Sequence, residues 1–237
     1  MGDIHQHAPV LLITSAFSRY PEALDWAKAA SELLWGPVGL VSDLFDFVET
    51  TYYEPTMGPH LKKVFFAYER LISPEELPAV KRQANAWEAE YAALGRHAEP
   101  RPLNLDPGYL TLGKVILAST KDHSHRLYLT DGIYGEVTLK YRDRAWLQTD
   151  WTFPDYRRPD YHQYFEACRN YLRGRQRAEL EQRRAEGSGL APDELAAANL
   201  PANFTDADLE DDDLEASNLE EGGFGDLDFE QREDTSA

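Results

Sequence analysis

The stretch from Arg101 to Tyr141 constrains the fold of this chain more than any other, because charged and polar side chains alternate there with apolar residues. Alternation with a period of two is typical of half-buried β-strands. The dipeptide Asp131-Gly132 separates two of the alternating segments, and such a pair is a strong hairpin signal. The stretch therefore predicts a strand followed by a β-hairpin, and its density of polar side chains marks it as the expected place of a functional site.

The hydrophobic pattern also selects a register for this hairpin. A two-residue loop would place Leu127 opposite Glu136 and mix the two faces. A three-residue loop over residues 130–132, with a bulge at Gly132, separates them. We predict this second register, which pairs Leu129 with Ile133, Leu127 with Gly135, His125 with Val137, Tyr128 with Tyr134, Arg126 with Glu136 and Ser124 with Thr138. The Arg126 and Glu136 side chains are then expected to form an ion pair on a solvated face.

Strand and helix patterns alternate in the first hundred residues. Val10–Phe17 is a continuous apolar run, typical of a strand buried on both faces, and Val38–Glu49 and Val64–Leu71 read as two more strands. Helices are expected to begin near Pro21 and after the capping residue Ser73. Their predicted apolar stripes are Leu24, Ala27, Leu34 and Trp35 in the first helix and Leu77, Val80, Ala84, Trp87, Tyr91 and Leu94 in the second.

This order of strand, helix, strand, strand and helix matches the start of a ferredoxin-like unit. In Leu105–Gly108, Pro107 and Gly108 occupy the central positions that a type II turn favours. A helix after Pro159 should dock on the sheet through Tyr161, Tyr164, Phe165, Cys168, Tyr171 and Leu172. The predicted fold class is α+β, with a mixed, largely antiparallel sheet, a ferredoxin-like β-α-β-β-α start, an extra hairpin, a C-terminal docking helix and an acidic C-terminal tail.

The charge is concentrated at one end of the chain. The formal net charge is −18, but residues 1–177 hold 21 Lys and Arg against 23 Asp and Glu, whereas residues 178–237 hold 3 against 19. We therefore expect a near-neutral globular domain at 1–177, a charged helical linker at 178–194 and an acidic tail at 195–237. This distribution argues against non-specific binding of nucleic acid or membrane by the whole chain.

Leu and Phe recur about every fifth residue between positions 195 and 231, with Asn or Asp directly before most of them. The pattern resembles that of pentapeptide repeats, whose members form a four-sided β-helix. An acidic segment with scattered Leu and Phe is also typical of a disordered interaction tail. Either interpretation implies a protein partner for the tail.

Composition and motifs exclude several kinds of site and of protein. The single cysteine, Cys168, excludes an internal disulfide and a cysteine-ligated zinc site. The sequence has no apolar run of membrane-spanning length and no signal peptide, so we expect a soluble, cytoplasmic protein. It also lacks the Gly-x-x-x-x-Gly-Lys-Ser/Thr phosphate loop.

A set of short blocks resembles a known family. They are Tyr52-Tyr-Glu-Pro-Thr-Met-Gly58, Asn104-Leu-Asp-Pro-Gly-Tyr109, Thr120-Lys-Asp-His-Ser-His-Arg126, Gly132-Ile-Tyr-Gly-Glu-Val-Thr-Leu139 and Trp151-Thr-Phe-Pro-Asp-Tyr156. Together they are similar to the uncharacterised bacterial domain-of-unknown-function family 4416, over roughly residues 8–175. The resemblance implies no mechanism.

Three functional hypotheses follow from the residues. The first is a binding domain for a nucleotide or another phosphate-bearing ligand, in which basic side chains neutralise phosphate and a tyrosine stacks on a base. Its candidate residues are Glu54, Asn104, Asp106, Lys114, Lys121, Arg126, Tyr128, Tyr134 and Glu136. No catalytic residue is identified.

The second hypothesis is a hydrolase that depends on a divalent metal, because histidines two positions apart on a strand share a face. Its candidate ligands are Asp122, His123 and His125, with Glu54, Asp106 or Glu136 completing the shell. The hairpin register also allows His125 to be a buried, hydrogen-bonded histidine. The third hypothesis is a non-catalytic adaptor that recruits a partner through the acidic tail.

Overall fold

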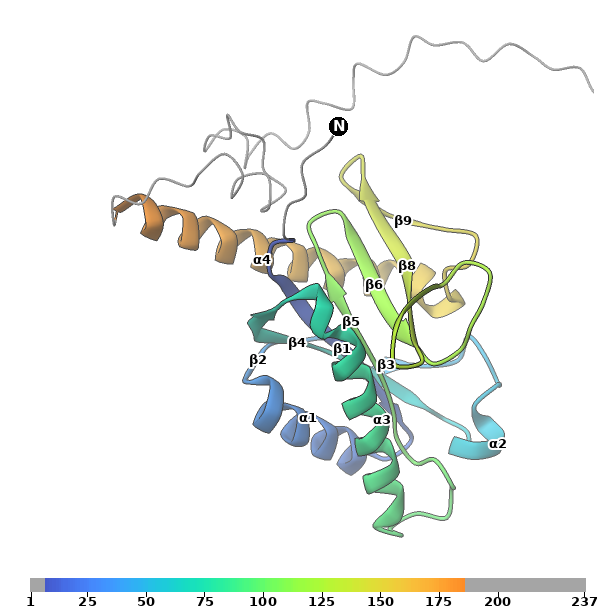
Figure 1. The fold of residues 1–237 in the computed structure, drawn as a ribbon. Coiled ribbons are helices and arrows are strands. Elements are labelled where there is room, and N and C mark those ends of the chain that lie inside the picture. The colour runs from blue at the N-terminus through green and yellow to red at the C-terminus, as the bar shows by residue number, and fades with distance from the viewer. Residues whose placement is uncertain (1–6, 186–237) are drawn as a thin grey trace, which may run out of the picture. The chain divides into compact units, whose positions relative to one another are not determined.

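The computed structural model describes residues 7–185, which form a single sheet with helices on both faces (Figure 1). The strands are β1 Val10–Ser18, β2 Val38–Val41, β3 Phe45–Asp46, β4 Lys62–Ile72, β5 Asn104–Leu110, β6 Lys114–Ser119, β7 Leu127–Thr130, β8 Ile133–Arg142 and β9 Ala145–Gln148. The helices are α1 Pro21–Trp35, α2 Glu54–Met57, α3 Leu77–Ala93 and α4 Pro159–Ala185, with 3-10 turns η1 Pro74–Glu76 and η2 Pro154–Arg157. The predicted tail at 195–237 and the linker beyond residue 185 lie outside the described residues.

The sheet order is β2-β4-β1-β5-β6-β8-β7, with β3 also pairing with β4 and β9 with β8. Every strand pair in this part of the chain is antiparallel. The predicted α+β class, with a largely antiparallel sheet and a C-terminal helix, is confirmed.

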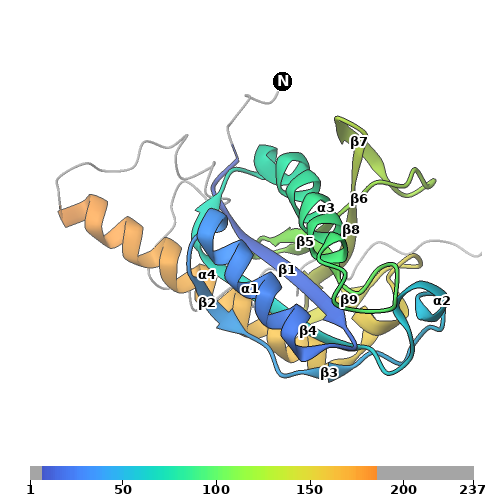
Figure 2. The same ribbon diagram turned by 90° about the horizontal axis from the view of Figure 1, so that it is seen from below.

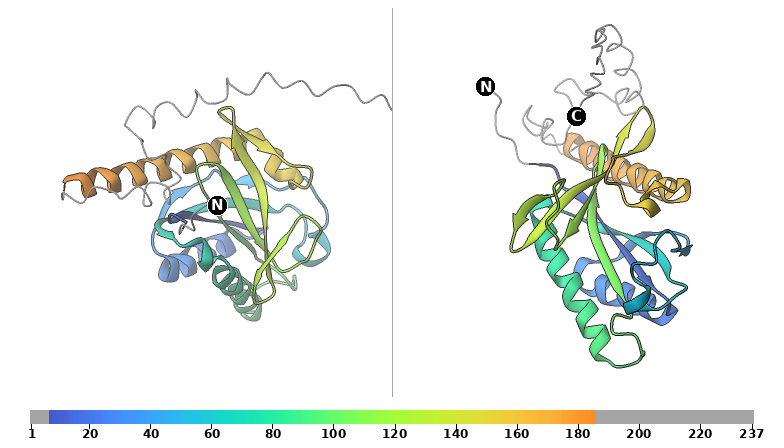
Figure 3. Two further views of the ribbon diagram at one scale, coloured as in Figure 1. Left: turned by 45° about the horizontal axis from the view of Figure 1, so that its top comes forward. Right: turned by 90° about the vertical axis from the view of Figure 1, so that its right-hand side faces the viewer.

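The central strand β1 explains why the sheet is covered on both faces. All nine of its residues are buried. Leu12 and Ala16 face a core built with α1 and α3, whereas Leu11 and Ile13 face a second core built with α4. Figure 2 shows α1 and α3 in front of β1 and β4 with α4 behind, and the right-hand view of Figure 3 places these helices on opposite sides of the strands. A strand between two apolar layers reads as a continuous apolar run.

The helix boundaries follow local signals. Gly36, with φ of 93°, ends α1. The predicted N-cap, Ser73, forms a reciprocal capping box with Glu76 at η1, directly before α3. Two residues of the predicted stripes are not buried: Leu34 is 57% exposed and Leu94 is 44% exposed. Leu34 lies about 100° around the helix from Trp35, and Leu94 follows the last residue of α3.

The α4 helix docks through the predicted side chains, since Tyr161, Phe165, Cys168 and Leu172 are buried in the second core. The helix passes residue 178, where the sequence pattern predicts the start of a linker, without a break. In the described part of the chain, no helix is both long enough and apolar enough to cross a membrane.

Cys168 provides a test of this packing. Burial raises the pKa of its thiol to about 12, so the reactive thiolate is scarce at neutral pH. We expect iodoacetamide at about pH 8 to leave the native protein unmodified and to alkylate Cys168 after denaturation. Mass spectrometry reads both states, and alkylation of the native protein at the rate of a free cysteine would contradict the packing of α4.

Two predicted elements are wrong in detail. Val38–Glu49 is not one strand, because the chain between β2 and β3 leaves the ladder at Ser42, whose hydroxyl accepts a hydrogen bond from the Phe65 amide at 2.8 Å. Leu105–Gly108 is not a type II turn but part of β5. Proline is tolerated at position 107 because the ladder between β5 and β6 runs only from Gly108 to Leu110.

The hairpin also differs from the predicted loop. Thr130 pairs with Ile133, so the loop has two residues, and Asp131 and Gly132 have φ of 53° and 74°. Positive φ at both central positions is the requirement of a type I′ turn. A register shift between Tyr128 and Thr130 absorbs the extra residue. The predicted pairs Leu127 with Gly135 and Tyr128 with Tyr134 are therefore confirmed, although the three-residue loop is wrong.

Candidate functional site

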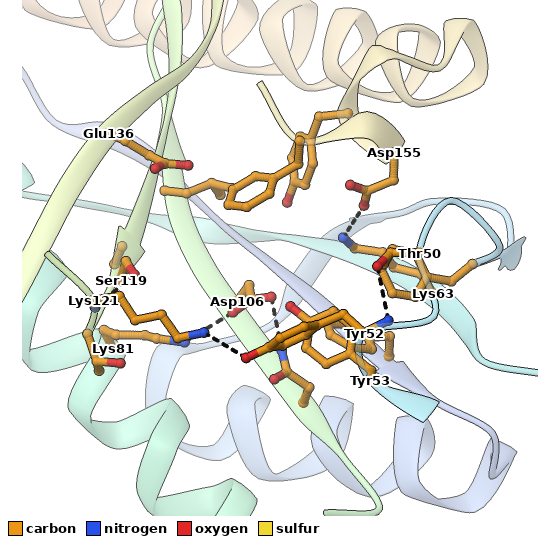
Figure 4. Close-up of a pocket in the computed structure, with 18 of the residues that line it drawn as sticks. Thr50, Tyr52, Tyr53, Lys63, Lys81, Asp106, Ser119, Lys121, Glu136 and Asp155 are labelled. Carbon is orange, nitrogen blue, oxygen red and sulfur yellow. Dashed lines mark hydrogen bonds and ion pairs between the residues drawn. The ribbon is translucent and has the colours of Figure 1, made fainter. Parts of the chain in front are cut away.

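A cavity of about 680 Å³ lies beside the central strands. Its walls come from β1, β4, β5, β6, β8, α3 and η2, and from the segments 47–53 and 119–126. Figure 4 shows Lys63 and Asp155 on one side, Lys81 and Lys121 on the other, and Asp106 between them. Residues far apart in the chain thus meet at one place.

The sheet itself opens this cavity. The ladder between β5 and β6 ends at the pair Gly108 and Leu117. Beyond that pair, Asn104 and Asp106 of β5 and residues 117–119 of β6 line the cavity instead of bonding to each other. Pro107, which has no N–H to donate, stands at this point. The end of the ladder therefore places polar side chains of two strands on facing walls.

Lys63 and Asp155 form a buried ion pair at one end of the cavity. The Lys63 Nζ lies 2.6 Å from the Asp155 Oδ2, and the two side chains are 3% and 6% exposed. The same Nζ lies 4.7–5.8 Å from the centroids of five aromatic rings, those of Phe17, Phe47, Phe65, Tyr156 and Tyr161. Aromatic faces attract a desolvated ammonium group, so the rings and the carboxylate together hold Lys63 in place.

A second buried lysine lies on the α3 side. The Lys81 Nζ donates to the Leu105 carbonyl oxygen at 2.8 Å and to the Asp106 Oδ1 at 3.2 Å. The Asn104 amide donates to the other Asp106 oxygen at 2.9 Å. Burial alone would raise the pKa of Asp106, but the charges of Lys81 and Lys63 and these hydrogen bonds outweigh it, and the pKa is lowered.

The pKa of Glu88, in α3, is shifted in the opposite direction to that of Asp106. Its carboxylate accepts from the Leu105 amide at 2.8 Å and from the Arg101 guanidinium at 3.3 Å. Burial raises its pKa, and the charge of Lys81 only partly opposes this. The cavity therefore contains two carboxyl groups, Glu88 and Asp106, whose pKa values move apart, an arrangement typical of functional sites.

Glu136 of β8 lies on the wall next to the hairpin. Its Oε2 accepts from the Arg126 Nε at 2.6 Å and contacts the His125 Nε2 at 2.9 Å. The Glu136 side chain is 1% exposed and that of Arg126 is 6% exposed. The predicted ion pair is present, but the prediction that it is solvated is wrong, because both side chains are almost completely buried and line the cavity.

Lys121 differs from the other basic residues of the cavity. Its Nζ donates to the Tyr52 hydroxyl at 3.2 Å and lies 5.1 Å from the centroid of that ring. Among the described residues, no carboxylate lies within ion-pair distance of it. The contact with Tyr52 joins the segments 47–53 and 119–126.

The structure brings together about half of the residues that the sequence suggested. Asn104, Asp106, Lys121, His123, Arg126 and Glu136 line the cavity, whereas Glu54, Lys114, Asp122, His125, Tyr128 and Tyr134 do not. Glu54 and Asp122 are exposed. Lys114 pairs with Lys140 in the ladder between β6 and β8. The Tyr128 and Tyr134 rings contact each other across the hairpin, with centroids 5.4 Å apart.

The two histidines of the proposed metal site lie in a loop and not on a strand. Their rings are parallel, with an interplanar angle of 2° and centroids 5.8 Å apart, and His125 also stacks on Trp151. Within residues 7–185, no group of three or more His, Cys, Asp or Glu side chains has an arrangement that suits a metal ion. The geometry therefore adds no support to the metal-dependent hydrolase.

Several cavity residues were not predicted. They are Tyr52, Lys63, Lys81, Glu88, Arg101 and Asp155. The sequence contains one signal for them: Lys81 falls between Leu77 and Ala84 of the α3 stripe, and a lysine so close to a buried stripe suggests an internal partner. Lys63 and Asp155 carry no such signal, since they are 92 positions apart.

Fold and site together define an α+β protein with a polar, internally ion-paired cavity at the edge where two central strands diverge. The chain matches the family model described as "Domain of unknown function (DUF4416)" over residues 8–171, and it belongs to that family. No curated protein and no solved structure matches it.

Proposed function

We propose that this cavity binds a small ligand that carries one anionic group, such as a phosphate monoester, and a planar ring. The volume of about 680 Å³ falls within the range of about 300–1,000 Å³ that is usual for small-molecule sites. The lining combines aromatic surface with a few fixed polar groups, as such sites do.

Lys121 is the observation on which the proposal depends. The other basic residues of the lining each have a carboxylate partner: Lys63 has Asp155, Lys81 has Asp106, Arg101 has Glu88 and Arg126 has Glu136. Only a neutral hydroxyl and a ring contact the Lys121 Nζ in the described part of the chain. An anionic ligand would give this amine a charge-assisted hydrogen bond, which is stronger than the one it makes with Tyr52.

The balance of charges in the cavity lining limits the charge that a ligand can carry. Five basic and five acidic side chains line the cavity, namely Lys63, Lys81, Arg101, Lys121 and Arg126 against Glu49, Glu88, Asp106, Glu136 and Asp155. A polyphosphate would meet as many carboxylates as cations. A single phosphate at Lys121 would meet one unpaired cation, so we favour a monophosphate over a triphosphate.

Tyr52 is the residue that we assign to the ring of the ligand. It is 66% exposed at the cavity wall and touches Lys121. This assignment replaces the earlier candidates Tyr128 and Tyr134, whose rings lie outside the lining. Stacking on an exposed tyrosine next to a lysine suits a phosphorylated ligand with a planar base.

Replacing Lys121 by alanine is the direct test. We expect the wild-type protein to be stabilised by a nucleoside monophosphate at millimolar concentration, and Lys121→Ala to weaken the affinity about tenfold or more, because a hydrogen bond to a charged group is lost. Differential scanning fluorimetry followed by isothermal titration calorimetry measures both. Lys114→Ala is the matched control, since it removes a lysine of β6 that lies outside the cavity. Equal loss in the two variants, or no binding by the wild type, would refute the proposal.

We also infer that β1, α1, β2, β4, α3 and β5 form a ferredoxin-like unit. Its support is the order β2-β4-β1-β5, the antiparallel pairing throughout, and the position of α1 and α3 on one face. The residues between β2 and β4, which include β3 and α2, are then an insertion, and its segment 47–53 supplies part of the cavity wall.

A further inference from the structure

We propose that Glu136 selects the ligand through a hydroxyl or amino group, so that the substrate class is a phosphate monoester with such a donor, for example a nucleoside monophosphate, and not a bare anion. This inference rests on the proposed function.

The two oxygens of the Glu136 carboxylate have different surroundings. Oε2 is held by Arg126 and His125 at 2.6 and 2.9 Å. Oε1 is buried and has no hydrogen-bond partner among the described residues. Figure 4 shows the carboxylate projecting from its strand toward the other residues of the cavity. One oxygen therefore fixes the side chain, and the other is left as an acceptor on the inner wall.

An acceptor in this position favours a neutral donor. Leaving a buried carboxylate oxygen without a hydrogen bond is costly, and a ligand that supplies the bond recovers that cost. The positive charge that Glu136 needs is already supplied by Arg126, so a cationic ligand group is not required. A hydroxyl or amino group matches the remaining need, while the anionic group of the same ligand lies at Lys121.

Such a site favours a ligand that carries the donor over one that lacks it, because only the first supplies a partner to a carboxylate oxygen that is already buried. Methyl phosphate has the anionic group and no donor on its ester part. A nucleoside or sugar monophosphate has both. Comparing methyl phosphate with a sugar monophosphate, which has hydroxyl donors and no planar ring, therefore separates recognition by Glu136 from anion binding at Lys121 and from stacking on Tyr52.

Glu136→Gln reverses the polarity of the recognising atom. Arg126 is always a donor, so the amide oxygen of glutamine must face it, and the amide NH₂ then takes the place of Oε1. Glu136→Asp is the second variant, because it keeps the charge opposite Arg126 and withdraws the carboxylate by one methylene group. Thermal unfolding of both variants without ligand identifies those that are folded.

The experiment measures by calorimetry the affinities of the wild type and both variants for methyl phosphate and for a panel of nucleoside and sugar monophosphates. We expect the wild type to prefer its best ester over methyl phosphate by about tenfold or more, and the variants to lose most of this preference without losing methyl phosphate. Preference retained in both variants would overturn the role of Glu136 and leave the proposed function standing. A wild type that binds methyl phosphate as tightly as its best ester would overturn the role of Glu136 and the assignment of Tyr52 to a ring. A wild type that binds none of these compounds would overturn the proposed function as a whole.

Discussion

Replacing Asp155 by alanine is expected to lower the free energy of unfolding by about 3–5 kcal/mol, because it leaves the ammonium group of Lys63 buried without its carboxylate. The pair is almost completely inaccessible, with side chains 3% and 6% exposed. The five surrounding rings stabilise the cation only in part, since a contact between a cation and a ring contributes less than a buried carboxylate does. Urea denaturation monitored by circular dichroism measures the loss.

The neighbouring pair of Lys62 and Asp46 is a matched control. It is one residue away in β4, but its side chains are 42% and 67% exposed, so Asp46→Ala should change the stability much less. The double replacement Lys63→Met with Asp155→Leu removes both charges and should recover most of the stability that Asp155→Ala loses. If Asp155→Ala and Asp46→Ala have equal effects, the pair in the cavity is solvated and this account of it is wrong.

The Lys63 and Asp155 pair also connects stability with the site. It links β4 to η2, two elements of the cavity wall that lie 92 positions apart. Buried pairs of this kind are weak evidence for stability, because apolar residues of similar volume often serve as well. They also position charged groups inside a cavity, which apolar residues do not. We therefore expect the double replacement to fold and to bind the proposed ligand less tightly than the wild type.

Hydrophobic periodicity predicted burial correctly where burial depends on the position of a residue within its own strand or helix. Val10–Phe17 reads as a strand between two apolar layers, and it is one, because each face of β1 meets a helix layer. The α3 stripe from Leu77 to Tyr91 is buried for the same reason. The prediction failed at Leu34, which lies within about 20° of Ala27 around the helix but is 57% exposed in the last turn of α1. Helical spacing alone does not exclude it.

The cavity was only partly predictable, because its polar residues are paired across long separations. The segment 119–126 and strand β8 contributed Lys121, Arg126 and Glu136, whose density in the sequence is a local signal. The sequence pattern begins the third strand at Val64, whereas β4 begins at Lys62 and includes Lys63. A lysine at the end of an apolar run is typical of the solvent-exposed end of a strand. Only the tertiary contact with Asp155 shows that Lys63 is buried.

The sequence pattern correctly singles out Gly108 as a position that needs glycine, but for the wrong physical reason. The sequence assigns it to a type II turn, where glycine supplies a positive φ. The structure places it in β5, paired with Leu117 of β6, and it is not among the residues with positive φ in the described part of the chain. What excludes a side chain there is space. A Cβ at position 108 would lie 2.1 Å from the Ile116 carbonyl oxygen and 2.8 Å from the Leu117 Cδ2.

Gly108→Ala is therefore expected to lower the free energy of unfolding by about 3 kcal/mol or more, because a backbone oxygen cannot rotate away as a side chain can. Gly113→Ala is the control, since no atom lies within 4 Å of a Cβ at that position, and it should leave the stability nearly unchanged. Urea denaturation compares the two variants, and a difference of less than about 1 kcal/mol would contradict the close approach of β5 and β6.

The same substitution reports on how the cavity is held open. The pair Gly108 and Leu117 is where the ladder ends and the cavity begins, and Asn104 and Asp106 lie on the diverging part of the same strand. Forcing the strands apart at position 108 would extend the divergence and move Asp106 away from Lys81. If Gly108→Ala still folds at low temperature, we expect it to bind the proposed monophosphate more weakly than Gly113→Ala does. Unchanged affinity in a destabilised variant would show that β5 holds these side chains independently of its pairing with β6.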